Sequence, residues 1–331
     1  MGRNSLILLA LLAAGLGAAY YLQQDASRPA STVSGSSREL LLPDLQGTLS
    51  TVTALDVRRP DQPDVRLARK DGVWVLPAKA DYPAAGQPVA TLLRALAEAR
   101  KVEAKTANPE LHGRVGLADK GGVDEQGTRI KLERGGEPPL ELLVGKPAQQ
   151  GKGQLVRLYG DNQVWLVDQA MPMPVSELAW LDRRVAEIPF ASIRQVEVAY
   201  PNGSRLTVYR DSASEPNLKL KQLPKGRRLA YEAAANGMAT LFAGLEFADN
   251  APLAQVQFKG KPLLEFSLST FDGGELRGEV HEQGKQPWLV LKGKEKLAEE
   301  RVPGKLDWAY RLEPFQYQAL AKTLEDVLAA K

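Results

Sequence analysis

The chain repeats one segment of its own sequence, and this repeat constrains the fold more than any other feature. Residues 82–100, YPAAGQPVATLLRALAEAR, align without a gap with residues 231–249, YEAAANGMATLFAGLEFAD. Eight of the nineteen aligned positions are identical, where composition alone would give roughly one or two. A chain with such a repeat is expected to build the same structural unit twice.

Both copies carry apolar residues at positions i, i+3, i+4 and i+7, which is the spacing of one helix face. The first helix is expected to start near Ala85 or Gly86, and Pro88 is compatible with this start because first-turn N–H groups have no partner within the helix. We expect Tyr82 and Tyr231 to anchor the starts of the two helices by packing. The apolar sets are Val89, Leu92, Leu93 and Leu96, and then Met238, Leu241, Phe242 and Leu245.

Runs with strand character flank each helix. Before it, the two copies have ALDVRR, DVRLAR and VWVL, and then VEVAY, RLTVYR and LKL. After it, they have TRIKLER, LELLVG, QLVRLYG and VWLVD, and then AQVQFKG, LLEFSLS, ELRGEVHE and PWLVL. In this order residues 165–167 match residues 288–290, and GKPAQQGKG (145–153) is interpreted as a hairpin loop.

The two copies also end alike, because residues 180–190 (WLDRRVAEIPF) resemble residues 308–315 (WAYRLEPF). Arg183 and Arg311 each follow a tryptophan by three residues, and we expect them to stack on an aromatic ring or to pair with Glu187 and Glu313. The final segment, FQYQALAKTLEDVLAAK, predicts an amphipathic helix. One face of this helix would carry Leu320, Leu324, Val327 and Leu328.

These patterns predict an α+β fold with two tandem copies of a mostly antiparallel sheet, each covered by a helix, after an N-terminal transmembrane helix. Strands in runs, with only one or two helices per copy, argue against a βαβ order. The expected divisions are a membrane anchor or signal peptide (1–22), a flexible linker (23–38), a first α+β repeat (39–190) and a second α+β repeat with a C-terminal helix (191–331).

The N-terminus indicates export. After Arg3, the 18 residues from Ser5 to Leu22 are uncharged and mostly apolar, which is near the lower limit for crossing a membrane. Arg3 favours an N-terminus inside the cell. An uncleaved anchor and a cleaved signal peptide both remain open, because Gly17 and Ala19 supply a small-x-small cleavage pattern. Both place the body outside the cytoplasm, and as a flexible coil the linker would reach roughly 20–25 Å.

Composition excludes several classes of function. The net charge of +3 is spread along the chain, and the short KGRR at residues 225–228 is interpreted as a solvated turn, so no nucleic-acid partner is expected. The chain has no cysteine, which excludes disulfides, thiolate metal sites and a lipoprotein anchor.

No catalytic, cofactor-binding or metal-binding residue is predicted. The motifs of serine hydrolases, zinc proteases and phosphate loops are absent from the sequence. His112 and His281 are isolated; Glu279 and Glu282 lie near His281, but successive strand residues face opposite sides, so no joint ligand set follows. The acidic group Asp119, Asp124 and Glu125 favours a turn over a calcium loop. We assign four tryptophans to the core rather than to a sugar-binding groove: Trp165, Trp180, Trp288 and Trp308.

The order of several short motifs resembles the bacterial domain-of-unknown-function 4340 family. They lie at residues 65–69 (V-x-L-x-R), 72–76 (G-x-W-x-L), 82–96 (the Tyr-led helix), 115–119 (V-G-L-x-D), 144–146 (V-G-K) and 163–168 (Q-V-W-L-V-D). The resemblance covers residues from about 45 to 325. It implies an exported, membrane-anchored protein whose gene often lies beside those of gliding-motility-type ABC transporters. The family has no established catalytic residues. Its members often carry an acidic residue at the helix start, where this chain has Ala85 and Ala234.

The resemblance, the apolar N-terminus and the missing catalytic set together predict a non-catalytic periplasmic accessory or binding subunit. It would be a single-pass protein of the bacterial inner membrane, with its N-terminus inside and its body in the periplasm. An ABC transporter permease or another inner-membrane protein is the expected partner. An envelope scaffold that binds proteins or cell-wall polymer without a transporter is the alternative, and a periplasmic hydrolase is the less favoured third possibility.

Overall fold

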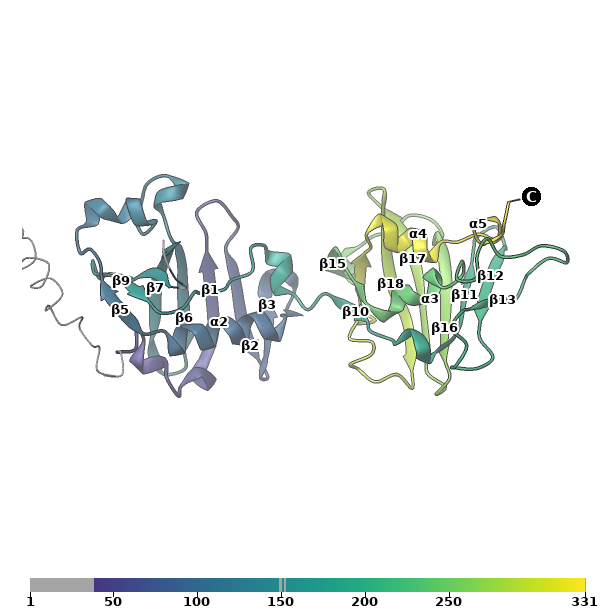
Figure 1. Cartoon of the computed structure of the whole chain (residues 1–331), viewed down its shortest axis with the longest axis horizontal. Helices are drawn as coiled ribbons and strands as arrows, with labels where there is room; N and C mark the ends of the chain where they lie inside the picture. Colours follow the sequence, from purple (N-terminus) through teal and green to yellow (C-terminus); the bar gives the residue numbers. More distant parts are fainter. Residues whose placement is uncertain (1–38, 149–150, 152, 331) are drawn as a thin grey trace, which may run out of the picture.

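The computed structural model describes residues 39–148, 151 and 153–330. These residues form two lobes along one long axis (Figure 1). The N-terminal lobe is built on a nine-stranded sheet and the C-terminal lobe on an eight-stranded sheet. The predicted anchor and linker, residues 1–38, lie outside the described residues. Among the described residues, no helix is both long enough and apolar enough to cross a membrane.

The N-terminal sheet is antiparallel throughout, with the spatial order β4-β3-β2-β1-β6-β7-β8-β9-β5. The chain turns between β7 and β8 as a hairpin, as the GKPAQQGKG segment predicted. The strands are β1 (Val52–Arg58), β2 (Val65–Lys70), β3 (Val73–Leu76), β4 (Tyr82–Pro83), β5 (Lys101–Ala104), β6 (Thr128–Arg134), β7 (Glu137–Pro147), β8 (Gln154–Leu158) and β9 (Val164–Val167).

The C-terminal sheet is also antiparallel, with the order β13-β12-β11-β16-β17-β18-β19-β15. A separate two-stranded pair joins β10 (Arg184–Ala186) to β14 (Leu245–Glu246). The strands of the large sheet are β11 (Ile193–Ala199), β12 (Arg205–Tyr209), β13 (Lys219–Leu220), β15 (Asp249–Pro252), β16 (Leu264–Thr270), β17 (Glu275–Gln283), β18 (Gln286–Glu295) and β19 (Trp308–Arg311).

The two sheet orders match strand by strand, except that the N-terminal sheet has β4 as an extra edge strand. This match corrects the strand alignment predicted from the sequence. Residues 254–260 form no strand. Each later strand of the second lobe therefore corresponds to a strand of the first lobe that lies one place earlier in the chain than we predicted. β9 therefore corresponds to β19 and Trp165 corresponds to Trp308, while Trp288 lies in β18. The prediction failed because alternation alone does not show which neighbour a strand pairs with.

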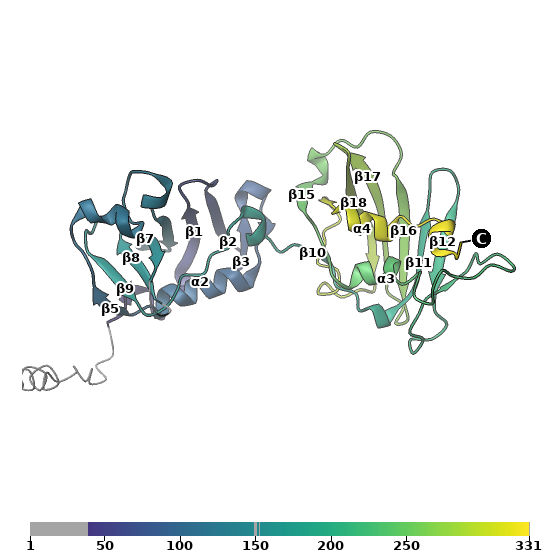
Figure 2. The ribbon, with the colours of Figure 1, turned by 45° about the horizontal axis from the view of Figure 1, so that its top comes forward.

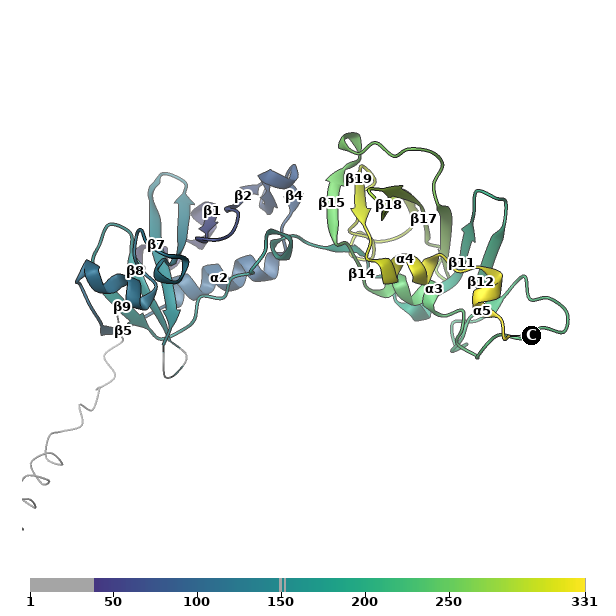
Figure 3. The same cartoon turned by 90° about the horizontal axis from the view of Figure 1, so that it is seen from above.

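The first predicted helix is confirmed. α2 (Gly86–Glu98) follows a cap at Ala85, and all four residues of its predicted apolar face are buried. Figure 3 shows α2 on one side of the first sheet, with α3 (Gly237–Thr240) and α4 (Pro314–Leu320) on one side of the second. Among the described residues, no helix covers the other face of either sheet, which we call the open face.

The second predicted helix is much shorter than the first. α3 has four residues and continues only as a single 3-10 turn to Ala243. Gly237 and Gly244 stand where the first copy has Pro88 and Ala95, and glycine inside a helix costs about 1 kcal/mol relative to alanine. Met238, Phe242 and Leu245 are nevertheless buried, so the apolar pattern was kept although the helix was not.

The single C-terminal helix that we predicted is wrong, because the structure has two short helices. α4 ends at Leu320, and α5 (Leu324–Val327) starts after a new cap. Asp326 accepts hydrogen bonds from the backbone N–H and the hydroxyl of Thr323, which is the arrangement that begins a helix. Leu320, Val327 and Leu328 are buried as expected.

The hydrophobic core is continuous through both lobes. The connecting chain contributes to this continuity, because β10 pairs with β14 and Val185 is fully buried in the C-terminal lobe. Figure 2 shows this connection as the thin segment between the two sheets. The same connection touches the first lobe, where Leu181 forms a bridge to Ala84.

Candidate functional site

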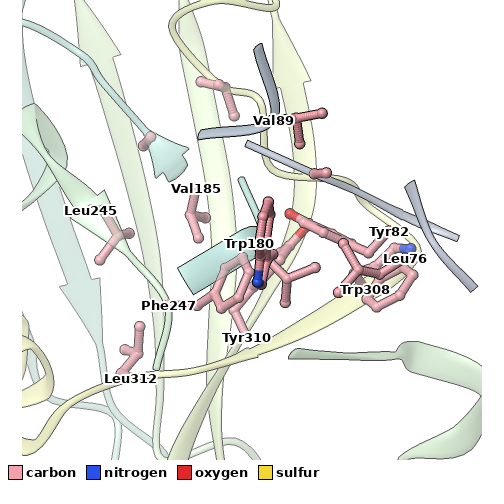
Figure 4. Close-up of a cluster of buried hydrophobic side chains, with 14 of the residues drawn as sticks. Leu76, Tyr82, Val89, Trp180, Val185, Leu245, Phe247, Trp308, Tyr310 and Leu312 are labelled. Carbon is pink, nitrogen blue, oxygen red and sulfur yellow. The ribbon is translucent and has the colours of Figure 1, made fainter. Parts of the chain in front are cut away.

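Tyr82 is buried, but not where the sequence placed it. Its side chain extends from the N-terminal lobe and packs edge-on against Trp308, Phe247 and Tyr310 of the C-terminal lobe (Figure 4). The ring centroids of Tyr82 and Trp308 are 4.6 Å apart. We call these four aromatic residues the lobe contact. It gives Tyr82 a structural role in joining the lobes rather than in opening its own helix.

Tyr231 contradicts the packing prediction. Tyr231 is 66% exposed, whereas Tyr82 is 2% exposed. No lobe follows the second copy of the repeat in the described chain, so nothing corresponds to the aromatic partners of Tyr82. Sequence similarity alone carried no information about this difference in surroundings.

Two polar contacts accompany the lobe contact. Lys79 pairs with Asp249 at 3.1 Å, and the Lys305 ammonium lies 5.6 Å from the centre of the Tyr82 ring. The backbone N–H of Ala85 donates to the Trp180 carbonyl, and that of Asp182 donates to the Pro83 carbonyl. The connecting chain therefore extends the β4 edge and holds Tyr82 in position.

Burial raises the pKa of Tyr310 to about 12, and burial together with the neighbouring Tyr310 raises the pKa of Tyr82. The folded state thus favours the neutral phenols, and their contribution is complete below pH 10, the ordinary tyrosine value. We expect the free energy of unfolding to fall as pH rises from about 10 to about 12, with Tyr310 accounting for about 2–3 kcal/mol.

Urea unfolding at pH 9 and pH 11.5 measures this loss. Tyr310→Phe should lose distinctly less stability than the wild type between the two pH values, because phenylalanine does not titrate. Parallel losses in both proteins would contradict the assignment.

The open face of the C-terminal sheet carries a charged hollow of about 240 Å³. Its side chains come from five neighbouring strands, β11, β12, β16, β17 and β18. Arg205 pairs with Glu197 at 2.9 Å, and Lys292 lies 3.5 Å from Glu279. The charged residues of the wall are Glu197, Arg205, Glu265, Arg277, Glu279 and Lys292.

A smaller hollow of about 110 Å³ lies at the matching place on the N-terminal sheet, beside Asp56. Asp56 and Glu197 are each the fifth residue of the corresponding strands β1 and β11. Arg66 holds Asp56 through two contacts of 2.9 and 2.8 Å, and Thr207, opposite Glu197, donates to it at 3.1 Å. Each sheet therefore has, at the same point of its open face, a carboxylate that accepts hydrogen bonds from the neighbouring strand.

The hollow in the C-terminal lobe has the side chains of a site for charged groups. Its three cationic and three anionic side chains can hold a small charged or zwitterionic group by hydrogen bonds and ion pairs. Among the described residues, no three His, Cys, Asp or Glu side chains are grouped to hold a metal ion. The sequence could indicate that these residues lie on the polar side of strands, but their convergence depends on pairing across five strands.

Both histidines have defined partners. His112 is buried, and its Nε2 lies 3.0 Å from the Asn162 carbonyl. His281 Nε2 lies 3.0 Å from Glu279, and its ring stacks on Phe258. Our argument that successive strand residues face opposite sides overlooked this pair, because residues two apart on a strand share a face.

The acidic group at residues 119–125 is spread over a turn. Asp119 binds the buried Arg157 at 2.6 Å, and Glu125 accepts from the backbone N–H of Gly122. Of the four tryptophans assigned to the core, Trp180 and Trp308 are buried, while Trp165 and Trp288 are partly exposed. The cation of Lys101 lies 4.9 Å above the Trp165 ring.

The expected partners of Arg183 and Arg311 are wrong. Arg183 donates to the Phe247 carbonyl and pairs with Glu246, and Arg311 donates to the Ala248 carbonyl. Both arginines thus hold the chain between β14 and β15. Arg184, the next residue along, is the one that pairs with Glu187.

A family model described as "Domain of unknown function (DUF4340)" matches residues 74–265. This range includes most of the N-terminal sheet, the connecting chain and the first strands of the C-terminal lobe. No curated protein and no solved structure matches the chain. Since the match spans more than half of the sequence, the chain belongs to the domain-of-unknown-function 4340 family.

Proposed function

We propose that the chain is a non-catalytic accessory subunit in the bacterial periplasm that presents a binding surface to an ABC transporter permease. One observation carries the binding part of this proposal. In the described part of the chain each sheet has one face without helices, and on the C-terminal sheet this face holds the charged hollow. Such a face suits recognition of a polar partner surface, since paired charges exposed on strands supply orientation more than stability.

We further infer that the two lobes are tandem copies of one unit. The repeated helix sequence, the matching strand order and the shared carboxylate position support this inference. Duplication would explain why a chain of this length carries two similar open faces along one axis. The lobe contact would then keep the two faces at a fixed separation.

The proposed location rests on the N-terminal sequence and on what family membership implies. An apolar segment after Arg3 would anchor the chain in the inner membrane, with the N-terminus inside. The polar linker would then hold the N-terminal lobe within roughly 20–25 Å of the lipid surface. A partner embedded in the same membrane is therefore within reach.

Crosslinking in native membranes tests the proposal. The full chain, tagged at its C-terminus, should recover a transporter permease or ATPase subunit after crosslinking and affinity purification. Arg205→Glu combined with Lys292→Glu should reduce that recovery by at least about fivefold, because charge reversal penalises a complementary partner. The matched control reverses two exposed lysines outside the hollow, Lys120→Glu and Lys259→Glu, and should recover as much as the wild type.

Recovery of no transporter subunit, with both proteins at normal levels, would contradict the proposal. Recovery of envelope proteins or cell-wall polymer in place of a transporter would support the scaffold alternative.

A further inference from the structure

The connecting chain passes from one lobe to the other between two neighbouring residues. The N-terminal lobe holds the chain up to Asp182, whose backbone N–H donates to the Pro83 carbonyl at 3.0 Å. The C-terminal lobe holds it from Arg183 onward, since the Arg183 carbonyl accepts from the Phe247 N–H at 3.0 Å. A change of backbone dihedral angles at Asp182 and Arg183 would therefore turn one lobe against the other without breaking a hydrogen bond within either.

Few other interactions join the lobes. Among the described residues, the ion pair between the lobes is that of Lys79 with Asp249, and both side chains are partly exposed. A pair this exposed adds little stability. Closure therefore depends mainly on the Tyr82 ring within the lobe contact. Interfaces between domains usually permit relative motion unless they are large and apolar.

The closed arrangement also buries polar groups that have no partner. Asn250 in β15 lies opposite Tyr310 and is 4% exposed. Neither the side-chain oxygen nor the side-chain nitrogen of Asn250 has a hydrogen-bond partner among the described residues. The indole N–H of Trp180, in the same group of buried side chains (Figure 4), also lacks a partner there. Burial of such groups opposes closure, because water would bond them if they were exposed.

The N-terminal lobe lies on the outer side of Asn250. β15 is the last strand of its sheet, so no further strand of the described chain covers it. The neighbouring Asp249 instead meets Lys79 of the other lobe, and Figure 1 shows β15 on the side of the C-terminal lobe that faces the N-terminal lobe. Separation of the lobes would admit water to Asn250 while it removes Tyr82 from its aromatic partners. These two effects oppose each other, which narrows the free-energy difference between the closed and open arrangements.

We propose that the lobes are joined by a hinge at Asp182 and Arg183, and that the packing of Tyr82 in the lobe contact holds this hinge closed. The closed arrangement is the major state and fixes the separation of the two open faces. An open arrangement is populated at about 1–10% and changes the angle between these faces. The hinge goes beyond the proposed function, because it acts on the open faces whatever partner they bind.

Single-molecule FRET tests the hinge. The chain has no cysteine, so two introduced cysteines carry the only dyes. Ala90 of α2 and Gln255, at the end of the 3-10 turn that follows β15, are both exposed. Ala90→Cys with Gln255→Cys therefore places one dye on each lobe of the purified full-length protein. We expect one major population and a minor one with a different dye separation, at about 1–10% of molecules.

Asn250→Leu locates the group that opposes closure. Leucine has a similar branched shape and no polar atoms, so the closed arrangement no longer buries an unpartnered amide. The ratio of open to closed molecules should fall at least about fivefold. The matched control is Asn236→Leu, because the Asn236 side chain already bonds Leu218 and Asn217 within the C-terminal lobe. This control should leave the ratio unchanged.

A charge exchange tests closure from the other direction. Lys79→Glu would place two carboxylates together, so the ratio of open to closed molecules should rise at least about threefold. Adding Asp249→Lys to this variant restores an opposite-charge pair and should return the ratio to the wild-type value.

Two outcomes overturn the proposal. The first is a single population with the same dye separation in the wild type, in Asn250→Leu and in Lys79→Glu, which would show rigidly joined lobes. The second is an unchanged or larger open fraction in Asn250→Leu, which would show that burial of this amide does not oppose closure. The assay contains no transporter, so its failure leaves the crosslinking test of the proposed function unaffected, and the reverse also holds.

Discussion

Tyr82→Ala is expected to lower the free energy of unfolding by about 3–5 kcal/mol and to free the two lobes to move against each other. Tyr82 is 2% exposed and contacts three aromatic side chains across the lobe contact. Its removal leaves a cavity between parts of the chain that are otherwise joined by a narrow connection. Urea unfolding measures the first effect, and small-angle scattering measures the second as a larger radius of gyration.

The repeat supplies the control. Tyr231 occupies the aligned position but is exposed, so Tyr231→Ala should change stability by less than about 0.5 kcal/mol. Tyr82→Phe keeps the ring and loses only the hydroxyl next to Tyr310, at a cost of about 1 kcal/mol. Equal effects of Tyr82→Ala and Tyr231→Ala would show that the lobe contact does not hold the lobes together.

The second large effect is expected for Arg210→Ala, at about 3–5 kcal/mol, because three hydrogen bonds from a charged donor are lost. Arg210 is 2% exposed and its guanidinium donates to three backbone carbonyls, those of Phe190, Ile193 and Glu215. It also lies over the Phe190 ring at 4.6 Å. Burial lowers its pKa, but an arginine remains charged at any ordinary pH. Alanine would remove the charged donor from all three carbonyls, which urea unfolding at pH 7 should detect.

Arg205→Ala is the matched control for this variant. Arg205 begins β12, the strand that Arg210 directly follows, but it is exposed and makes a surface pair with Glu197, which is worth at most about 1 kcal/mol. Arg210→Lys should fall between the two, because one ammonium cannot reproduce the planar set of donors. A loss below about 1 kcal/mol for Arg210→Ala would show that water replaces the guanidinium at these carbonyls.

Local patterns predicted the elements that depend on neighbouring residues in sequence. The apolar period of α2, its start at Gly86 and most of the strands follow from spacing and turn residues. The hairpin between β7 and β8 follows for the same reason. The short α3 was visible in principle, because Gly237 and Gly244 interrupt the pattern that Pro88 and Ala95 permit.

Features that depend on distant partners were not predictable from one sequence. Tyr82 and Tyr231 stand in similar segments, yet within the described residues Tyr82 is buried against the other lobe and Tyr231 is exposed. The strand that we expected at residues 254–260 alternates as a strand does, but no neighbour pairs with it. The charged hollow depends on the register of five strands, which fixes that Glu197 and Arg277 share one face.

The lobe contact can form only after nearly all of the chain has been synthesised. Tyr82 leaves the ribosome 228 residues before Tyr310, a delay of roughly 10–50 s at ordinary synthesis rates. During that time the N-terminal lobe can close its own sheet, but its aromatic side chain has no receiving surface. A nascent chain interrupted before β19 would therefore carry a folded first lobe with an exposed tyrosine, marking it as unfinished to chaperones and proteases.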